Sequence, residues 1–228
     1  MGLKRPSPHK EVSVFKTTYD NINGHIILPC EGKRLLVDTG SPISICYGSM
    51  DFLVREYQLH TPVQGASPEA LSEFIGTQID ALIGLDILSN HDLRLDWNTL
   101  EFDPEENGDG ESLPLSFGNF GLPAIPIEVN GHTVEVIFDT GAQISYINKS
   151  VVVGECSVGE FCDFHHTVGE FTTDVYRLPT KFGEQVLTLD YGLLPESVYG
   201  GNLDILGTEV LKHFPVTLRF SRREFVVG

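Results

Sequence analysis

Residues 35–43 read LLVDTGSPI, and residues 136–144 read VIFDTGAQI. Each copy is an apolar run that ends in Asp-Thr-Gly and continues with similar residues. The two aspartates, Asp38 and Asp139, are separated by 101 positions (139 − 38). Average residue usage makes Asp-Thr-Gly about a one-in-several-thousand event at any position. Two copies in matched surroundings therefore indicate an internal duplication.

A second pair of segments repeats downstream of each Asp-Thr-Gly. Residues 82–102 read LIGLDILSNHDLRLDWNTLEF, and residues 205–225 read ILGTEVLKHFPVTLRFSRREF. Gly84 and Gly207 align at an offset of 123 (207 − 84), which holds without a gap through both segments. Each half of the chain therefore contains an apolar strand, Asp-Thr-Gly, a variable middle, an apolar-apolar-Gly block, a short helix and an alternating strand.

The local patterns predict mostly β-strands. Residues 25–40 are expected to form a hairpin with a turn at Glu31-Gly32, and residues 125–141 form its counterpart. In the second hairpin, Asn130-Gly131 is a strong two-residue turn signal. Many short strands separated by turns predict an all-β class.

Helical signals are few. Ser67 is a candidate N-cap, Pro68 and Glu69 suit a first turn, and Gly76 is a stop signal, so a helix is expected between them. Two further short helices are expected directly after Gly84 and Gly207, over residues 85–90 and 208–214.

The duplication divides the chain into two lobes. We expect an N-terminal extension at residues 1–12, a first lobe at 13–102 and a second lobe at 113–228. Residues 103–112 between them are acidic, contain glycine and begin DPEENGDGE. They are interpreted as an exposed linker, although a solvated loop within one domain would have the same composition.

The charge balance excludes some partners. The 228 residues include 32 acidic and 15 basic side chains, for a net charge of −17. A nucleic acid or an anionic membrane is not expected as a partner, because both require a basic face. The first residues lack the apolar core of a secretory signal and no apolar run is long enough to span a bilayer, so a cytoplasmic location is expected. A chain trimmed of a leader would look the same.

Four cysteines are present: Cys30, Cys46, Cys156 and Cys162. The first two lie in apolar stretches and are expected to be small core residues. The last two are close enough in sequence to form a disulfide in an oxidising compartment. The nearby histidines, 165 and 166, make a zinc site conceivable, but the spacing matches no standard ligand pattern, so no metal and no cofactor are expected.

A single Asp-Thr-Gly after a buried strand is usually a turn in which the carboxylate binds nearby backbone amides. Two copies change this interpretation. If the halves pack about a pseudo-twofold axis, Asp38 and Asp139 can meet there, and two adjacent carboxylates share one proton because both cannot ionise cheaply. Such a pair can activate water against an amide carbonyl and protonate the leaving nitrogen, without a metal or a covalent intermediate.

These motifs resemble those of aspartic peptidases of the pepsin and retropepsin superfamily. The resemblance rests on VDTGS at 37–41, FDTGA at 138–142 and the two apolar-apolar-Gly blocks ending at Gly84 and Gly207, and it covers nearly the whole chain past about residue 12. It implies a bilobal fold of two retropepsin-like units, related to the double-psi β-barrel, in one chain. A homodimer would then be unnecessary, and a monomer is expected.

The resemblance also implies roles for the loop residues. Asp38 and Asp139 would be the catalytic dyad, and Thr39 and Thr140 would hydrogen-bond across the axis. The glycines that follow them, Gly40 and Gly141, would flank the bound water and contact the peptide.

The next position differs between the halves, Ser41 in the first and Ala142 in the second. In such families a hydroxyl there hydrogen-bonds the dyad and favours acidic operation, whereas Ala suits a higher pH. A mildly acidic optimum is therefore expected.

Two departures from the family pattern stand out. In this family a hairpin called the flap closes over the substrate, and the first variable middle is too short to form a full one. A single principal flap is therefore expected from the second half. Phe171 or Tyr176 is expected to be its substrate-facing aromatic. Either residue could equally be an ordinary strand residue packed on the lobe. The arginine usual after the glycine is replaced by Leu85 and Thr208, which leaves its bracing role unassigned.

The expected function is that of an aspartic endopeptidase acting on a peptide or protein substrate. The alternative is a catalytically silent, retropepsin-like peptide-binding or regulatory module. Intact Asp, Thr and Gly in both halves favour the enzyme, because a binding module does not need two mutually repelling carboxylates.

Overall fold

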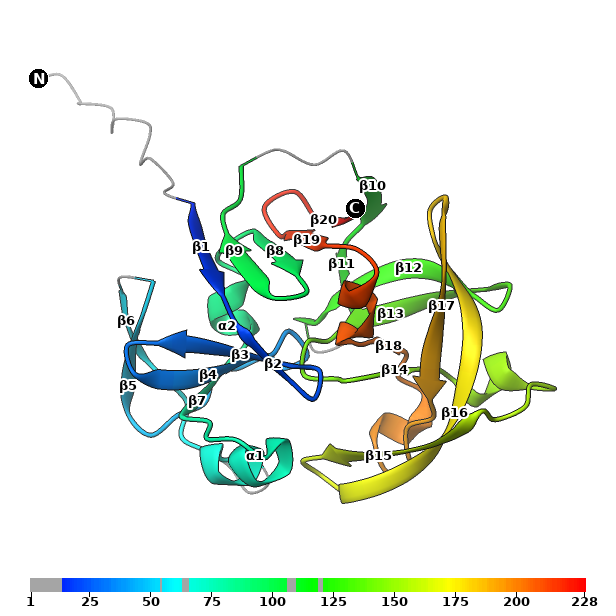
Figure 1. Cartoon of the computed structure of the whole chain (residues 1–228), viewed down its shortest axis with the longest axis horizontal. Helices are drawn as coiled ribbons and strands as arrows, with labels where there is room; N and C mark the ends of the chain where they lie inside the picture. Colours follow the sequence, from blue (N-terminus) through cyan, green and yellow to red (C-terminus); the bar gives the residue numbers. More distant parts are fainter. Residues whose placement is uncertain (1–13, 54, 63–65, 106–109, 119–120) are drawn as a thin grey trace, which may run out of the picture.

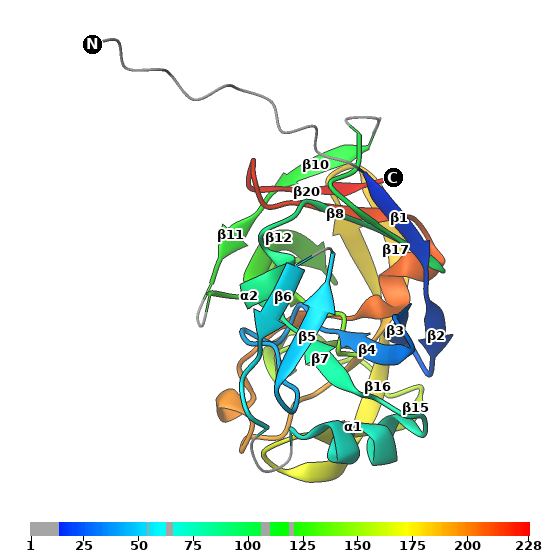
Figure 2. The same cartoon turned by 90° about the vertical axis from the view of Figure 1, so that its left-hand side faces the viewer.

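The computed structural model describes residues 14–53, 55–62, 66–105, 110–118 and 121–228. The predicted extension at 1–12 and positions 106–109 of the predicted linker lie outside this set. The described chain is mostly β and two-lobed, as predicted, with the first-half strands on one side and most second-half strands on the other (Figures 1 and 2).

The first lobe contains a four-stranded sheet in the order β2 (Asp20–Ile22), β3 (His25–Cys30), β4 (Lys33–Val37) and β7 (Ala81–Ile83). A separate antiparallel pair consists of β5 (Ser49–Phe52) and β6 (Arg55–Gln58). Strands β4 and β7 are parallel, and Val37 lies opposite Ile83. The strand that leads into the first Asp-Thr-Gly therefore lies beside the strand that leads into Gly84.

The second lobe repeats this arrangement in a larger sheet. Its order is β11 (Ser116–Phe117), β12 (Pro123–Val129), β13 (His132–Phe138), β18 (Ile205–Leu206), β14 (Ser145–Tyr146), β17 (Gln185–Gly192), β16 (Gly169–Phe182) and β15 (Gly159–His165). Strands β13 and β18 are parallel, and Phe138 lies opposite Leu206. The long second middle thus adds strands to the sheet, which the short first middle does not.

A six-stranded sheet joins the lobes, at the top of Figure 1. Its order is β1 (Phe15–Thr18), β9 (Thr99–Phe102), β8 (Leu93–Asp96), β19 (Val216–Arg219), β20 (Glu224–Val227) and β10 (Glu111–Pro114). The antiparallel pairing of β8 with β19 is centred on Arg94 opposite Thr217. These two residues are counterparts at the repeat offset of 123, so the pseudo-twofold axis passes between them.

The two predicted hairpin turns are confirmed. Glu31 and Gly32 have φ of 49° and 78°, and Asn130 and Gly131 have φ of 50° and 79°. Positive φ at both central positions is the type I′ geometry, whose twist matches that of the flanking strands.

Helix α1 (Pro68–Ile75) confirms the expected helix. The Ser67 hydroxyl accepts a hydrogen bond from the amide of Ala70 at 3.2 Å, and Gly76 ends the helix at φ 77°. Helix α2 (Leu85–Leu88) follows Gly84 as predicted, whereas its counterpart after Gly207 is the 3₁₀ helix η4 (Thr208–Lys212). Two more 3₁₀ segments are η2 (Lys149–Val152) and η3 (Tyr199–Gly201).

One continuous core cluster includes buried side chains from both lobes, such as Val37, Leu95, Phe138 and Leu218.

The burial of the cysteines follows the expectation: Cys46 is buried and Cys30 is half-buried, while the remaining two are exposed free thiols. Among the described residues, none of the helices combines the length and apolar composition needed to cross a bilayer.

The close packing of Gly84 gives a test of the fold. A Cβ at this position would lie 2.5 Å from the carbonyl oxygen of Ile43, which belongs to the backbone and cannot move freely. Gly84→Ala is expected to lower the free energy of unfolding by about 1–3 kcal/mol in a urea titration. Gly159→Ala is the matched control, because a Cβ there meets nothing within 4 Å. Equal stability of the two variants would contradict this packing argument.

Candidate active site

Each Asp-Thr-Gly aspartate is positioned by the parallel strand pair beneath it. The amide of Asp38 donates to the carbonyl of Ile83 at 3.0 Å, and the amide of Asp139 donates to the carbonyl of Leu206 at 3.0 Å. The apolar strands are buried, so each carboxylate emerges where its strand leaves the core.

The two loops are locked together by their threonines. The amide of Thr39 donates to Thr140 Oγ1, and the amide of Thr140 donates to Thr39 Oγ1, both at 3.0 Å. The Thr39 hydroxyl donates to the carbonyl of Phe138 at 2.7 Å, and the Thr140 hydroxyl donates to that of Val37 at 2.8 Å. Both threonines are fully buried, so four backbone groups depend on two side chains from opposite lobes.

This lock brings the two carboxyl groups against each other's loops. Gly40 donates its amide to Asp38 Oδ1 at 2.8 Å, and Gly141 donates to Asp139 Oδ1 at 2.7 Å. A Cβ at Gly40 would lie 2.2 Å from Asp139 Cγ, and one at Gly141 would lie 2.9 Å from Asp38 Cγ. Only glycine leaves room for the opposite carboxyl group, which explains the residue type at both positions.

The pKa values of both carboxyl groups are raised. Burial disfavours the ionised form of Asp38, and the charge of Asp139 and a hydrogen bond with it raise the pKa further. Burial also raises the pKa of Asp139, while the amide of Gly141 and the hydrogen bond with Asp38 oppose the shift. The pair is therefore suited to holding one shared proton.

Gly84 and Gly207 support the two Asp-Thr-Gly loops through hydrogen bonds to buried serines. The amide of Gly84 donates to Ser44 Oγ at 2.8 Å, and that of Gly207 donates to Ser145 Oγ at 3.2 Å. These serines are fully buried. The duplication aligns Ser44 with Ser145, but sequence analysis assigned them no role because a buried serine carries no local signal.

Ser41 corrects one implication of the family resemblance. Its hydroxyl donates to the carbonyl of Ile43 at 2.8 Å rather than to a dyad carboxylate. Only the backbone amide of Ser41 acts on Asp38, where it lowers the pKa. In the other lobe Ala142 is buried beside the dyad.

Thr208 partly fills the bracing role left open by the missing arginine. Its hydroxyl donates to the carbonyl of Gly24 in the first lobe at 2.7 Å and also lies 3.1 Å from the carbonyl of Ala142. A residue of η4 thereby ties the second lobe to the turn before β3.

The dyad lies in a cleft with a cavity of about 360 Å³. Its walls come from both lobes and include α1 on one side and the hairpin of β15 and β16 on the other. Figures 1 and 2 show α1 beside this hairpin. The rings of Phe74 in α1 and Phe164 in β15 stack with centroids 4.8 Å apart, so the two elements meet across the cleft.

The hairpin supplies one predicted aromatic but not the other. Phe171 lines the cavity, whereas Tyr176 packs against the main core. The two positions differ by an odd number along β16, and successive side chains of a strand point to opposite faces. The prediction for Tyr176 is therefore wrong. In the first lobe, α1 is the element that faces this hairpin across the cleft.

Sequence analysis missed His25, a buried residue of the cleft wall. Burial lowers the pKa of His25 to about 4, and the Gly141 backbone opposes this shift. The Gln143 side-chain nitrogen lies 3.1 Å from His25 Nε2. In the neutral ring this atom can accept a hydrogen bond from the Gln143 amide. His25 lies outside the repeated motifs, and Gln143 differs from its counterpart Pro42 in the other copy, so only the fold reveals their proximity.

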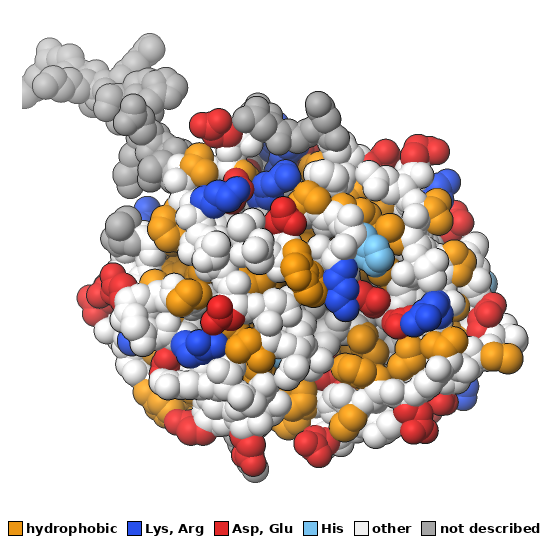
Figure 3. Space-filling model, in the orientation of Figure 1, with side chains coloured by type: hydrophobic (Ala, Val, Ile, Leu, Met, Phe, Trp, Pro, Cys, Tyr) orange, Lys and Arg blue, Asp and Glu red, His pale blue; other side chains and the backbone are white. Residues whose placement is uncertain are grey.

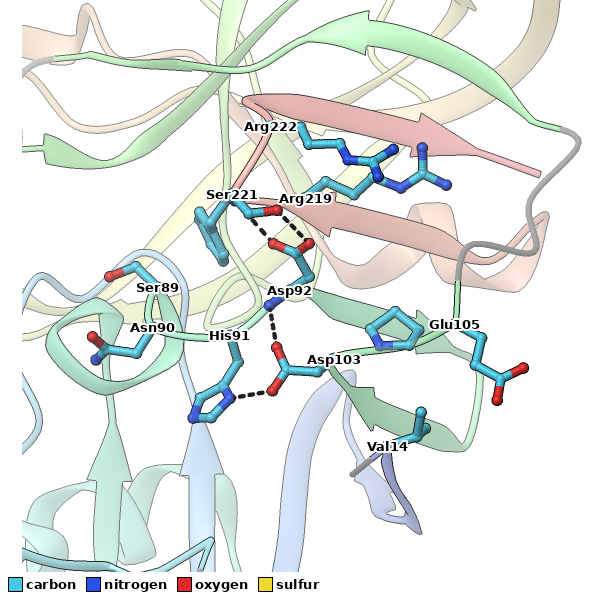
Figure 4. A pocket seen from close by; sticks show the side chains of 12 residues that line it. Val14, Ser89, Asn90, His91, Asp92, Asp103, Glu105, Arg219, Ser221 and Arg222 are labelled. Carbon is cyan, nitrogen blue, oxygen red and sulfur yellow. Dashed lines mark hydrogen bonds and ion pairs between the residues drawn. The ribbon is translucent and has the colours of Figure 1, made fainter. Parts of the chain in front are cut away.

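A second, larger cavity of about 600 Å³ lies beside the inter-lobe sheet (Figure 4). Two of its carboxylates, Asp92 and Asp103, already accept hydrogen bonds from neighbouring groups. Asp92 accepts from the amide and hydroxyl of Ser221, and Asp103 accepts from the amide of Asp92 and is bonded to His91 Nδ1 at 2.7 Å. These bonds join β8 to the turn between β19 and β20, so this cavity is part of the lobe junction rather than a second reaction centre.

The threonine lock should be needed for stability. Thr140→Val keeps the volume but leaves the buried Thr39 amide and Val37 carbonyl without their partner. Each such group costs about 1–3 kcal/mol, so a loss of about 2–5 kcal/mol is expected in a urea titration. Thr140→Ser keeps the hydroxyl and should lose much less. Similar losses in both variants would show that the methyl group, not the hydrogen bonds, stabilises the loops.

The raised pKa values predict a stability change for Asp139→Asn. A carboxyl whose pKa is raised by folding stabilises the fold below its unfolded value, 3.8 here, and this contribution is lost as the pH rises through the folded pKa. Removing one charge should therefore raise the melting temperature at pH 7 by a few degrees, since one kcal/mol corresponds to about 2–4 °C in a chain of this size.

The difference between Asp139→Asn and the wild type should shrink as the pH falls toward 4, as followed by circular dichroism. Asp174→Asn, which removes an exposed charge, is the control and should not reproduce the effect. A lower melting temperature for Asp139→Asn at pH 7 would argue against a repelling pair.

No family model matches the chain. Its fold resembles that of the aspartic proteinase from Irpex lacteus, with a TM-score of 0.56 and 13% identity over 95% of this chain and 97% of that one. It also resembles basic 7S globulin from soybean, with a TM-score of 0.54 and 11% identity over 94% of each chain. The chain therefore has a two-lobed fold similar to that of these two proteins.

Proposed function

We propose that the chain is an aspartic endopeptidase that hydrolyses peptide bonds with water activated between Asp38 and Asp139. The observation that carries this proposal is the pair of carboxyl groups with raised pKa values, each against the glycine of the opposite loop. This chemistry uses no metal and no cofactor.

In the first step, one carboxylate of the pair takes a proton from water as the water oxygen bonds to the carbonyl carbon of the substrate amide. The other, protonated carboxyl group donates its proton to the carbonyl oxygen. The product is a neutral tetrahedral diol, and the shared proton has moved across the pair. The protein lowers the activation barrier by positioning these groups, because backbone amides hold both carboxyl groups before the substrate binds.

In the second step, the dyad takes a proton back from one hydroxyl of the diol and a proton is delivered to the amide nitrogen. The C–N bond then breaks, which releases an amine and a carboxylic acid. The loops need not move between steps, because the threonine lock fixes them relative to each other.

The same geometry weighs against the alternative of a silent peptide-binding module. The soybean neighbour is named a globulin and the Irpex neighbour a proteinase, so the fold alone does not decide activity. A binding module gains nothing from two adjacent carboxyl groups, whose burial and repulsion reduce stability near neutral pH. Since both lobes belong to one chain, we also propose a monomer that holds an extended peptide in the cleft.

The test is cleavage of a diverse peptide mixture from pH 3 to pH 7, read by mass spectrometry. Wild type should cleave with a bell-shaped pH profile in the mildly acidic range, and pepstatin should inhibit it. Asp139→Asn should lose at least about 10³-fold in rate, because it removes the dyad's shared-proton chemistry.

Cleavage that persists in folded Asp139→Asn would place the activity elsewhere. No cleavage by a folded wild type that still binds peptides would favour the silent module. A rate that is still rising at pH 3, the lower end of the range, would contradict the raised pKa values.

A further inference from the structure

Asp163 is a third carboxyl group in the cleft. It lies in β15, is only 6% exposed and lines the same cavity as the dyad. The hairpin register pairs it with Phe171 of β16, which also lines the cavity. Aspartate is disfavoured in strands and rarely buried without a counterion, so its place on this wall requires an explanation.

The hydrogen bonds of Asp163 hold it in place without neutralising it. Its Oδ2 accepts from the Tyr146 hydroxyl, and its Oδ1 accepts from the amide of Phe164 at 2.8 Å. Among the described residues, no Lys, Arg or His forms an ion pair with it. A carboxylate oxygen can accept two hydrogen bonds. Each oxygen of Asp163 has one partner, so each can accept one more.

The opposite wall of the cleft is different. Ile45 is the counterpart of Tyr146 at the repeat offset of 101, and it packs in a cluster with Leu36, Ile75 and Leu82. All four line the cleft and none of them is polar. The symmetric floor around the dyad is therefore flanked by one wall that is apolar apart from the neutral His25 and one wall with a buried acid.

We propose that Asp163 is a specificity-determining residue that binds a lysine or arginine side chain of the substrate. The proposal rests on the endopeptidase function proposed above. A buried carboxylate is stabilised by a cation that it hydrogen-bonds, and none is supplied by the described chain. The cationic head would donate to the open acceptor positions of Asp163, while Tyr146 keeps the carboxylate in orientation.

The surroundings fit the rest of a basic side chain. Phe171, Leu194 and Leu203 pack with Tyr146 in a small apolar cluster that also lines the cleft. The aliphatic stem of Lys or Arg packs favourably on such a surface while its head reaches a polar partner. The net charge of −17, with acidic side chains around the edge of the face in Figure 3, favours encounter with a basic peptide.

The experiment compares wild type with Asp163→Asn on the peptide mixture, and then on matched peptides that carry either Lys or norleucine at the preferred position. Asn removes the charge and replaces one of the two acceptor oxygens with an NH2 group, while the remaining oxygen can still accept from the Tyr146 hydroxyl. Wild type should favour Lys or Arg at one subsite, and the Lys-to-norleucine ratio of kcat/KM should fall about tenfold or more in the variant. Cleavage of the norleucine peptide should persist, which also shows that the variant is folded.

Asp174→Asn is the matched control, because it removes the same charge from an exposed position of the same hairpin. It should leave the ratio unchanged. An equal ratio in wild type and Asp163→Asn, or no basic preference in wild type, would overturn the inference while leaving the endopeptidase intact. A folded wild type that cleaves nothing would instead overturn the proposed function, and this inference with it.

Discussion

The reciprocal hydrogen bonds of Thr39 and Thr140 are the constraint on which the site depends. Each hydroxyl serves two backbone groups, both in the opposite lobe, so neither loop can be satisfied alone. Because the groups are buried, a lost partner is costly. The lock forces Asp38 and Asp139 into the same small space, and their raised pKa values follow from that proximity and from burial.

The duplication is symmetric at the base of the cleft and asymmetric above it. Below, the parallel strand pairs and the glycine–serine contacts repeat almost bond for bond. Above, one lobe contributes α1 and the other the β15–β16 hairpin, and they meet through Phe74 and Phe164. The symmetry places the two carboxyl groups in equivalent positions. Under the function proposed above, the asymmetry would suit recognition of an extended peptide, which has different side chains on either side of the bond to be cut.

Several unfavourable features of the fold are concentrated in this cleft. Two acids share one space, a third is buried with no counterion among the residues that the structure describes, and His25 is held neutral in the wall. None of these features stabilises the native state by itself, and the extensive apolar core offsets their cost. Residues that reduce stability at one concave site are most simply explained by binding and chemistry there.

The sequence alone determined the duplication, the two Asp-Thr-Gly loops, both hairpin turns and helix α1, because each has a local signal: a repeat, Glu-Gly or Asn-Gly, or a serine cap with a terminal glycine. Tertiary structure alone decided which side chains face the cleft. The strand register placed Phe171 and Asp163 there and turned Tyr176 into the core. The Ser41 hydroxyl and the Thr208 bridge likewise depend on partners brought close only by packing, which local sequence does not encode.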